Sequence, residues 1–230
     1  MNKIINSILL CSATIFGANV ASADVIYADN FSTNTGWTLG TNWQIGATSV
    51  SPAGTGNSDP ALDHSATADN GVLGAKLGGN IGAPDGLHGF YYATSPIYNL
   101  TNASNVSVSF FRWLNSDYDP YMTSQVEAFD GAAWNVIYTN CCIDENGYVS
   151  DNSWKQYTYN VSTYADHNAA FQLRYSYDVT SSGVYSISGW NVDDLAVSGK
   201  VPEPATFALL GLGLAGLGLS RRKKLDLANS

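Results

Sequence analysis

Basic residues are scarce in the body of this chain. Between Asp24 and Lys200 there are five Lys and Arg residues against 17 Asp and Glu, a net charge of about −12. A body this acidic repels phosphate backbones, so nucleic acid is excluded as a partner. The charge favours divalent cations and polymers of neutral or basic character, although an ordinary solvated acidic surface explains it equally well.

Cysteine is also scarce, with three residues in the whole chain. Cys11 lies in an N-terminal apolar stretch, which leaves only the adjacent pair Cys141 and Cys142 in the body. A disulfide between neighbours closes a strained ring, so three states stay open in an oxidising compartment: a vicinal bridge, bonds to other chains, or free thiols. No second Cys or His pair lies at a usable distance, which excludes a zinc knuckle.

The body has little of the Leu/Lys/Glu/Ala pattern that makes amphipathic helices, and it is rich in Tyr, Trp, Ser, Thr, Asn and Gly. It therefore predicts an all-β fold. Many short strands joined by Gly, Asn and Asp loops favour one domain over 24–200, a two-sheet antiparallel jelly-roll β-sandwich. The expected strands are 25–28, 43–45, 90–98, 106–114, 124–129, 134–138, 154–161, 171–177 and 190–197.

Two further expectations concern the inside and outside of this sandwich. The stretch from Thr48 to Gly89 is too polar and glycine-rich to form core, and loops of this length usually have a function. Four tryptophans stand in or beside strands and are expected in the core: Trp113, Trp134, Trp154 and Trp190. Tyrosines set among Asp, Pro and Gly are expected to be exposed, where they could stack on sugar rings: Tyr118, Tyr121 and Tyr148.

The N-terminus has the order of parts of a signal peptide at residues 1–23. Lys3 supplies a positive charge, residues 4–20 are largely apolar, and Ala21 and Ala23 are the small residues that signal peptidase accepts. The mature chain is then expected to begin at Asp24. The alternative is an uncut membrane helix, but this apolar stretch is diluted by polar residues and falls short of the roughly 20 residues that a span needs.

The C-terminal segment, 201–224, combines three features without a gap. Pro202, Glu203 and Pro204 precede an apolar run over 205–219, and a basic cluster beginning with Arg221 and Arg222 follows at 221–224. The run predicts a short transmembrane helix that reaches about 22 Å, which is marginal against a hydrocarbon core of about 30 Å. The basic cluster and the tail, 225–230, would stay cytoplasmic. An ordinary single-pass anchor is the alternative.

This segment resembles the PEP-CTERM sorting signal, found at the C-termini of many otherwise unrelated exported proteins of Gram-negative bacteria. The resemblance implies recognition of Pro202, Glu203 and Pro204 by an exosortase, a membrane-embedded cysteine transpeptidase-like enzyme. It also implies an exported protein of the cell envelope, cell surface or extracellular matrix, at least transiently held in the membrane. Exosortases often occur in species that make extracellular polysaccharide, so an association with exopolysaccharide or biofilm is expected.

The body resembles the MAM-like, concanavalin-type jelly-roll modules called choice-of-anchor J. That family implies a non-catalytic adhesion or binding module, often with calcium. The sharpest mark is the ending from Gly189 to Leu195. The other phrases that carry the resemblance are Asp29-Asn30-Phe31, Trp37, Trp43, Asp59-Pro60, Asp63-His64, Asp69-Asn70-Gly71, residues 91–96, residues 110–115, Trp134 and Ser153-Trp154.

Calcium is the expected cofactor, because hard cations take six to eight oxygens at flexible spacing. Four oxygen-bearing side chains lie within twelve residues: Asp59, Asp63, Asp69 and Asn70. Asp29 and Asp193 are expected to meet where the first and last strands pair. Equally, these acids could cap turns through backbone amides, as Asp and Asn do in glycine-rich loops.

We therefore expect a non-catalytic protein that binds polysaccharide or other surface components. The alternative is a carbohydrate-active enzyme of jelly-roll fold, a glycosidase or polysaccharide lyase, which would need two carboxylates facing each other across a cleft. Among 17 acids nothing singles out such a pair, and His64, His88 and His167 belong to no catalytic motif.

Overall fold

The computed structural model describes residues 24–52, 54–65, 68–141, 147–202 and 213–214. Several predicted features lie outside these ranges: the signal peptide with Ala21 and Ala23, Cys142, and most of the sorting segment, including Glu203, Pro204, Arg221 and Arg222.

The larger sheet has seven strands, all antiparallel. Its main path runs β10 (Val149–Ser150), β7 (Ser104–Ser116), β14 (Trp190–Lys200), β4 (Gly71–Ala75) and β3 (Trp43–Ala47). Off this path, β1 (Asp24–Asp29) pairs with β14 and β11 (Lys155–Asn160) pairs with β7.

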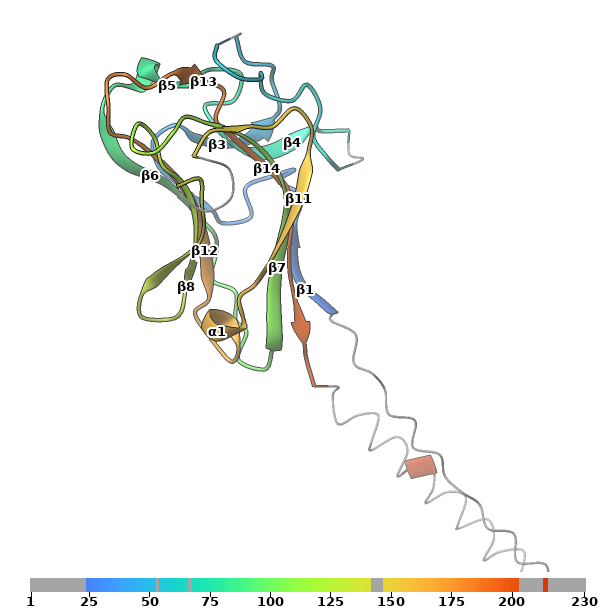
Figure 1. Cartoon of the computed structure of the whole chain (residues 1–230). Helices are drawn as coiled ribbons and strands as arrows, with labels where there is room; N and C mark the ends of the chain where they lie inside the picture. The colour runs from blue at the N-terminus through green and yellow to red at the C-terminus, as the bar shows by residue number, and fades with distance from the viewer. Residues whose placement is uncertain (1–23, 53, 66–67, 142–146, 203–212, 215–230) are drawn as a thin grey trace, which may run out of the picture.

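The second sheet has five antiparallel strands in the order β2 (Thr38–Leu39), β6 (His88–Thr94), β12 (Gln172–Val179), β8 (Ser124–Phe129) and β9 (Trp134–Thr139). A separate two-stranded sheet pairs β5 (Ile81–Gly82) with β13 (Ser186–Ile187). The helical elements of the body are η1 (Ala83–Asp85) and α1 (Ser162–Ala165). Figure 1 shows the two layers, with β7, β11 and β1 in one and β6, β12 and β8 in the other.

The predicted jelly-roll β-sandwich is confirmed, and each of the nine expected strands coincides with an observed one. The alternation that predicted the strand over 106–114 is visible in β7, where Val106, Val108 and Phe110 are buried and the residues between them are more exposed. Period-two alternation works here because successive side chains of a strand point to opposite faces.

Aromatic side chains join the two sheets across the core. The fully buried ring of Tyr175 on β12 meets Phe110 on β7 edge-on, with ring centroids 5.2 Å apart, and Trp190 on β14 at 5.7 Å. Edge-to-face pairs of this kind add roughly 0.5–1.5 kcal/mol beyond the burial of their area. The core therefore fixes how the sheets face each other.

The expectation that residues 48–89 contribute nothing to the core is wrong. β4 lies within this stretch, between β3 and β14, and is buried along its whole length. Val72 and Leu73 are fully buried, and so is Ile81 further along. The glycines that suggested a loop serve close packing instead: a Cβ at Gly71 would lie 2.6 Å from the backbone oxygen of Phe31.

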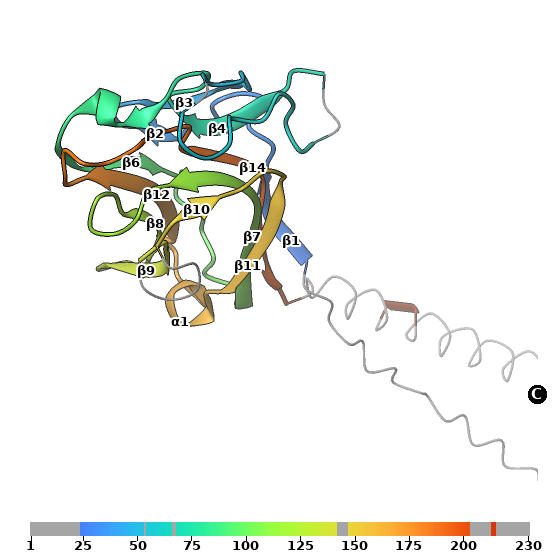
Figure 2. The ribbon, with the colours of Figure 1, turned by 45° about the horizontal axis from the view of Figure 1, so that its top comes forward.

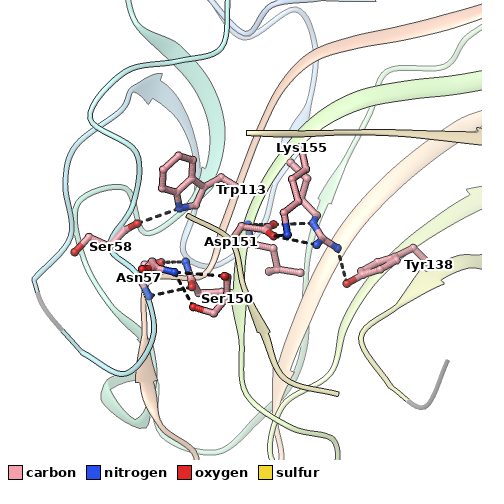
Figure 3. Close-up of polar contacts among 11 residues, drawn as sticks. Asn57, Ser58, Trp113, Tyr138, Ser150, Asp151 and Lys155 are labelled. Atoms are coloured by element: carbon pink, nitrogen blue, oxygen red, sulfur yellow. Dashed lines mark hydrogen bonds and ion pairs between the residues drawn. The ribbon is translucent and has the colours of Figure 1, made fainter. Parts of the chain in front are cut away.

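The expected core positions of the tryptophans are correct only for Trp190, which is fully buried. The other three are half-buried. Trp113 and Trp154 lie toward the outside of the larger sheet, and their indole nitrogens donate to the backbone oxygens of Ser58 (3.0 Å) and Leu62 (3.1 Å). They hold the segment after β3 against the sheet, and Figure 3 shows the bond from Trp113 to Ser58.

The chain enters and leaves the sandwich at the same end. Asp24 at the start of β1 pairs with Gly199 near the end of β14, and Figure 2 shows these two strand ends side by side. Lys200 in turn pairs with Ser104, where β7 begins. β7 then runs for 13 residues, about 40 Å, to the opposite end.

Candidate ligand-binding site

An open pocket of about 340 Å³ lies at the end of the sandwich remote from Lys200. It is built by two connections, the segment 117–123 between β7 and β8 and the segment 180–185 between β12 and β13. Its lining consists of Asp117, Tyr118, Tyr121, Gly183 and Tyr185, and we call it the tyrosine pocket.

Three tyrosines in this pocket are unusually exposed for large rings. The exposed fractions are 44% for Tyr118, 41% for Tyr121 and 47% for Tyr185. Tyr148 is half-buried and stacks on Tyr118, with ring centroids 5.1 Å apart. The exposure predicted for Tyr118 and Tyr121 is confirmed, and the structure brings the two together with Tyr185, which the sequence analysis missed.

Asp117 ties the two connections together. Its side chain is 1% exposed, and its two carboxylate oxygens accept one backbone N–H each, from Tyr118 and from Tyr185, both at 2.7 Å. Hydrogen bonds to a charged acceptor are roughly twice as strong as neutral ones. The carboxylate therefore fixes the spacing of two tyrosines that lie far apart in the sequence.

Asn140, which follows β9 and is 2% exposed, holds the segment between β7 and β8 through hydrogen bonds. Its Nδ2 lies within hydrogen-bond distance of the backbone oxygens of Asp117 (2.9 Å), Met122 (3.2 Å) and Gly147 (2.9 Å). Its Oδ1 accepts from the backbone N–H of Ser124 at 2.7 Å. One amide thus holds both ends of the segment that carries Tyr118 and Tyr121.

Three carboxylates predicted to bind calcium, those of Asp29, Asp193 and Asp59, instead accept hydrogen bonds that hold loop segments in place. Asp29 is 8% exposed and accepts from the backbone N–H of Phe31 (2.9 Å), the hydroxyl of Thr35 (2.5 Å) and the indole N–H of Trp37 (3.0 Å). It therefore closes the loop that follows β1, as an Asp that caps a turn does.

Asp193 serves a different loop. It is fully buried and accepts from the backbone N–H groups of His64 (2.8 Å) and Ser65 (2.9 Å), while burial raises its pKa. The neighbouring Asp194 contacts the Nδ1 of His64 at 2.7 Å, and the imidazole stacks on Phe111 with centroids 3.3 Å apart. Asp193 thus fastens the 63–65 segment to β14. The first and last strands pair as expected, with Asp29 opposite Leu195, and a joint site of Asp29 and Asp193 stays a prediction.

Asp59 is 3% exposed, and its Oδ1 accepts from the Nδ2 of Asn191 on β14 at 2.6 Å. Burial raises the pKa of this carboxyl to about 7. Its backbone N–H donates to the hydroxyl of Ser51 at 2.9 Å. Asp59 therefore anchors the long connection between β3 and β4 to the centre of the larger sheet.

Asn70 links the remaining predicted ligands. Its Oδ1 accepts from the backbone N–H of Asp63 at 2.6 Å, and its backbone has a φ of 59°. Asp69 precedes it, next to the start of β4. Among the residues that the structure describes, no three His, Cys, Asp or Glu side chains are grouped so that they could hold a metal ion. Calcium binding stays a prediction.

Cys141 is disulfide-bonded, and its partner lies outside the described residues. Its Sγ is 3.1 Å from the Oδ2 of Asp119, in the segment that carries Tyr118 and Tyr121. The covalent link therefore lies next to the tyrosine pocket.

Two further pockets of about 230 and 430 Å³ share Tyr27 on β1. Asp29 lines the first, and the second is lined mainly by residues 99–103 and Val201. None of these three pockets in the described chain brings two carboxylates face to face. The non-catalytic role stays a prediction.

The comparison with known families decides the nature of the C-terminal segment. Residues 200–223 match the PEP-CTERM protein-sorting motif. The predicted motif is thereby confirmed, and it marks the chain for exosortase-sorted export to the cell surface. Within the described part of the chain, no helix has both the length and the apolar character needed to cross a bilayer.

The solved structures that match this chain are distant in sequence. The K1 cleaved adhesin domain of Lys-gingipain from Porphyromonas gingivalis W83 is 14% identical, with 74% of this chain and 96% of that chain covered and a TM-score of 0.42. CBM35 from Paenibacillus barcinonensis is 17% identical, with coverages of 74% and 95% and a TM-score of 0.36.

The enzymatically active domain of tailspike protein 4 from bacteriophage CBA120 is 11% identical, with coverages of 75% and 20% and a TM-score of 0.39. No curated protein matches the chain in sequence. These likenesses are too distant to bear on ligand or catalysis. The PEP-CTERM motif is confirmed, whereas the choice-of-anchor J resemblance stays a prediction.

Proposed function

We propose that this chain is a non-catalytic surface or extracellular-matrix protein of a Gram-negative bacterium, and that it binds extracellular polysaccharide at the tyrosine pocket. The observation that carries the proposal is the gathering of three tyrosines, each more than 40% exposed, around one concavity. The association with exopolysaccharide or biofilm follows from this binding.

Exposed rings in one place need a reason, because soluble proteins rarely leave large apolar surfaces together in water. Tyrosine suits a saccharide ligand: its ring face packs on the C–H face of a sugar and its hydroxyl can bond to sugar hydroxyls. A pocket of about 340 Å³ is within the range of small-ligand sites. Asp117 and Asn140 hold the rings in place before the ligand arrives, which lowers the entropy lost on binding.

The position of the pocket fits a protein held at its C-terminus. The PEP-CTERM motif begins at residue 200, where β14 pairs with the start of β7. The tyrosine pocket follows the far end of β7, about 40 Å away. Figure 1 shows β5 and β13, next to the pocket segment 180–185, at the end opposite the start of β1 and the end of β14. An anchored body would therefore present the pocket to the surroundings.

The processing partners follow from the two ends of the chain. We propose that signal peptidase cuts after Ala23 and that an exosortase recognises the segment containing Pro202. Mass spectrometry of the protein recovered from the producing cell identifies its N-terminal and C-terminal residues in one experiment. Recovery from the cytosol with both ends intact would contradict the export proposal.

Binding is tested on a glycan array with the full chain in detergent. Tyr121→Ala and Tyr185→Ala are each expected to weaken binding roughly tenfold, because each removes one stacking ring. The matched control is Val136→Ala on β9, since Val136 is 48% exposed and lies outside the pocket. Unchanged binding by both tyrosine variants would exclude this site. Release of reducing ends from the bound polysaccharide would exclude a non-catalytic role.

A further inference from the structure

We propose that the tyrosine pocket selects a positively charged amino sugar, so that its polysaccharide carries free amino groups. This inference rests on the proposed function and names the ligand class of the same site. The juxtaposition that carries it is three exposed tyrosine rings and one carboxylate, with no basic side chain among the described residues of the lining.

The rings provide the first attraction. The face of an aromatic ring carries negative charge density, and an ammonium within about 6 Å of the ring centroid is attracted to it. Tyr118 and Tyr121 come from one connection and Tyr185 from the other, so a group that enters between them meets rings from both sides. A neutral sugar would gain stacking from these rings but not this electrostatic contribution.

Asp117 provides the second attraction. Each of its carboxylate oxygens accepts a single backbone N–H in the structure. These two bonds leave the carboxylate buried at the pocket wall, so it acts on a bound ammonium through its charge and not through a direct hydrogen bond. Because Asp117 is 1% exposed, its charge acts through a medium that screens it less than water does.

The basic residues of the body give an acidic sugar no partner at this site. Four of the five are ion-paired: Lys76 with Asp85, Arg112 and Lys155 with Asp151, and Arg174 with Glu127. The fifth, Lys200, lies at the opposite end of β7. With a body charge of about −12, a uronate or sulfated chain is repelled and a cationic chain is attracted.

The test compares hexasaccharides whose substituents are cationic, neutral or anionic. The full chain in detergent is titrated calorimetrically with a glucosamine hexasaccharide, with its fully N-acetylated counterpart and with a uronate hexasaccharide. We expect the glucosamine form to bind roughly tenfold tighter than the acetylated form, and the uronate form to bind more weakly than either.

A charge-neutral variant separates the pocket from the general attraction of an acidic protein. Tyr121→Leu keeps the apolar bulk and the net charge but removes one ring, so the ratio between glucosamine and acetylated forms is expected to fall several-fold. Val136→Ala is expected to keep the ratio. A ratio that stays the same in Tyr121→Leu overturns the inference.

The outcomes also separate the two proposals. Equal or tighter binding of the acetylated or uronate form overturns the amino-sugar inference and leaves polysaccharide binding in place. Failure of every saccharide to bind overturns the proposed function itself.

Discussion

Arg112 and Asp151 form an ion pair inside the sandwich, with the guanidinium Nε 2.9 Å from the carboxylate Oδ2 and side chains 1% and 0% exposed. The same guanidinium, from β7 of the larger sheet, donates to the hydroxyl of Tyr138 on β9 of the other sheet at 2.8 Å. Figure 3 shows Asp151, Tyr138 and Lys155 in this region. A second cation contacts the same carboxylate, because Nζ of Lys155 lies 2.7 Å from Oδ1 of Asp151.

Removing the buried carboxylate is expected to destabilise the fold strongly. Asp151→Ala leaves the guanidinium of Arg112 buried without its partner and should lower the free energy of unfolding by about 3–5 kcal/mol. Lys155→Ala is the matched control, because the side chain of Lys155 is 48% exposed and its ion pair should contribute less than about 1 kcal/mol. Urea unfolding measures both. If both variants lose the same free energy of unfolding, the large effect of Asp151→Ala does not come from leaving a buried charge unpaired.

Asn140 is expected to control the tyrosine pocket without contacting the ligand. Asn140→Ala leaves three backbone oxygens without its amide, and should lower stability by roughly 1–3 kcal/mol and weaken glycan binding. Hydrogen exchange should accelerate at the amide of Ser124, which donates to Asn140. Asn135→Ala, near the start of the strand β9 that Asn140 follows, is the control. Binding unchanged in Asn140→Ala would show that the pocket does not need this amide.

Much of the fold could be predicted because its signal is local. The alternation of Val106, Val108 and Phe110 follows directly from the geometry of a half-buried strand. The sorting motif is likewise a contiguous run. β4 was missed because Val72 and Leu73 are flanked by Gly71 and Gly74, and glycine in a strand depends on close neighbours that the sequence does not reveal.

The site was harder to predict because it depends on residues distant in sequence. Tyr118 and Tyr121 stood out through their Asp and Pro neighbours, whereas Tyr185 follows a Ser-Ser-Gly turn at the other side of the pocket. Nothing local marks Asp117 as the residue that joins them. A buried polar side chain is recognised only once its partners are known.

Calcium binding is tested by thermal unfolding. If the loop with Asp63 and Asp69 takes a calcium ion, added calcium should raise the melting temperature relative to chelator, because a ligand that binds only the folded state stabilises it. Asp63→Asn should reduce this shift, and the exposed Asp130→Asn should retain it. If calcium leaves the melting temperature unchanged, the prediction of calcium binding is wrong.

Asp59 is expected to make stability fall as pH rises. Its pKa is raised from 3.8 to about 7 by burial, so the folded chain holds a proton that the unfolded chain has released. The resulting stabilisation is present below about pH 4 and is lost as pH rises through about 7, with a total of at most about 4 kcal/mol. Asp59→Asn, which resembles the protonated carboxyl, should lack this pH step, so the difference between the two unfolding free energies isolates Asp59.

Asp130→Asn is the control with the opposite sign, because hydrogen bonds from Ala133 and Ala132 lower the pKa of Asp130. Its carboxylate stabilises the fold above the unfolded pKa, so this variant should lose stability relative to wild type as pH rises through about 4. If the free energies of unfolding of wild type and Asp59→Asn differ by the same amount at every pH from 4 to 8, the raised pKa of Asp59 is contradicted.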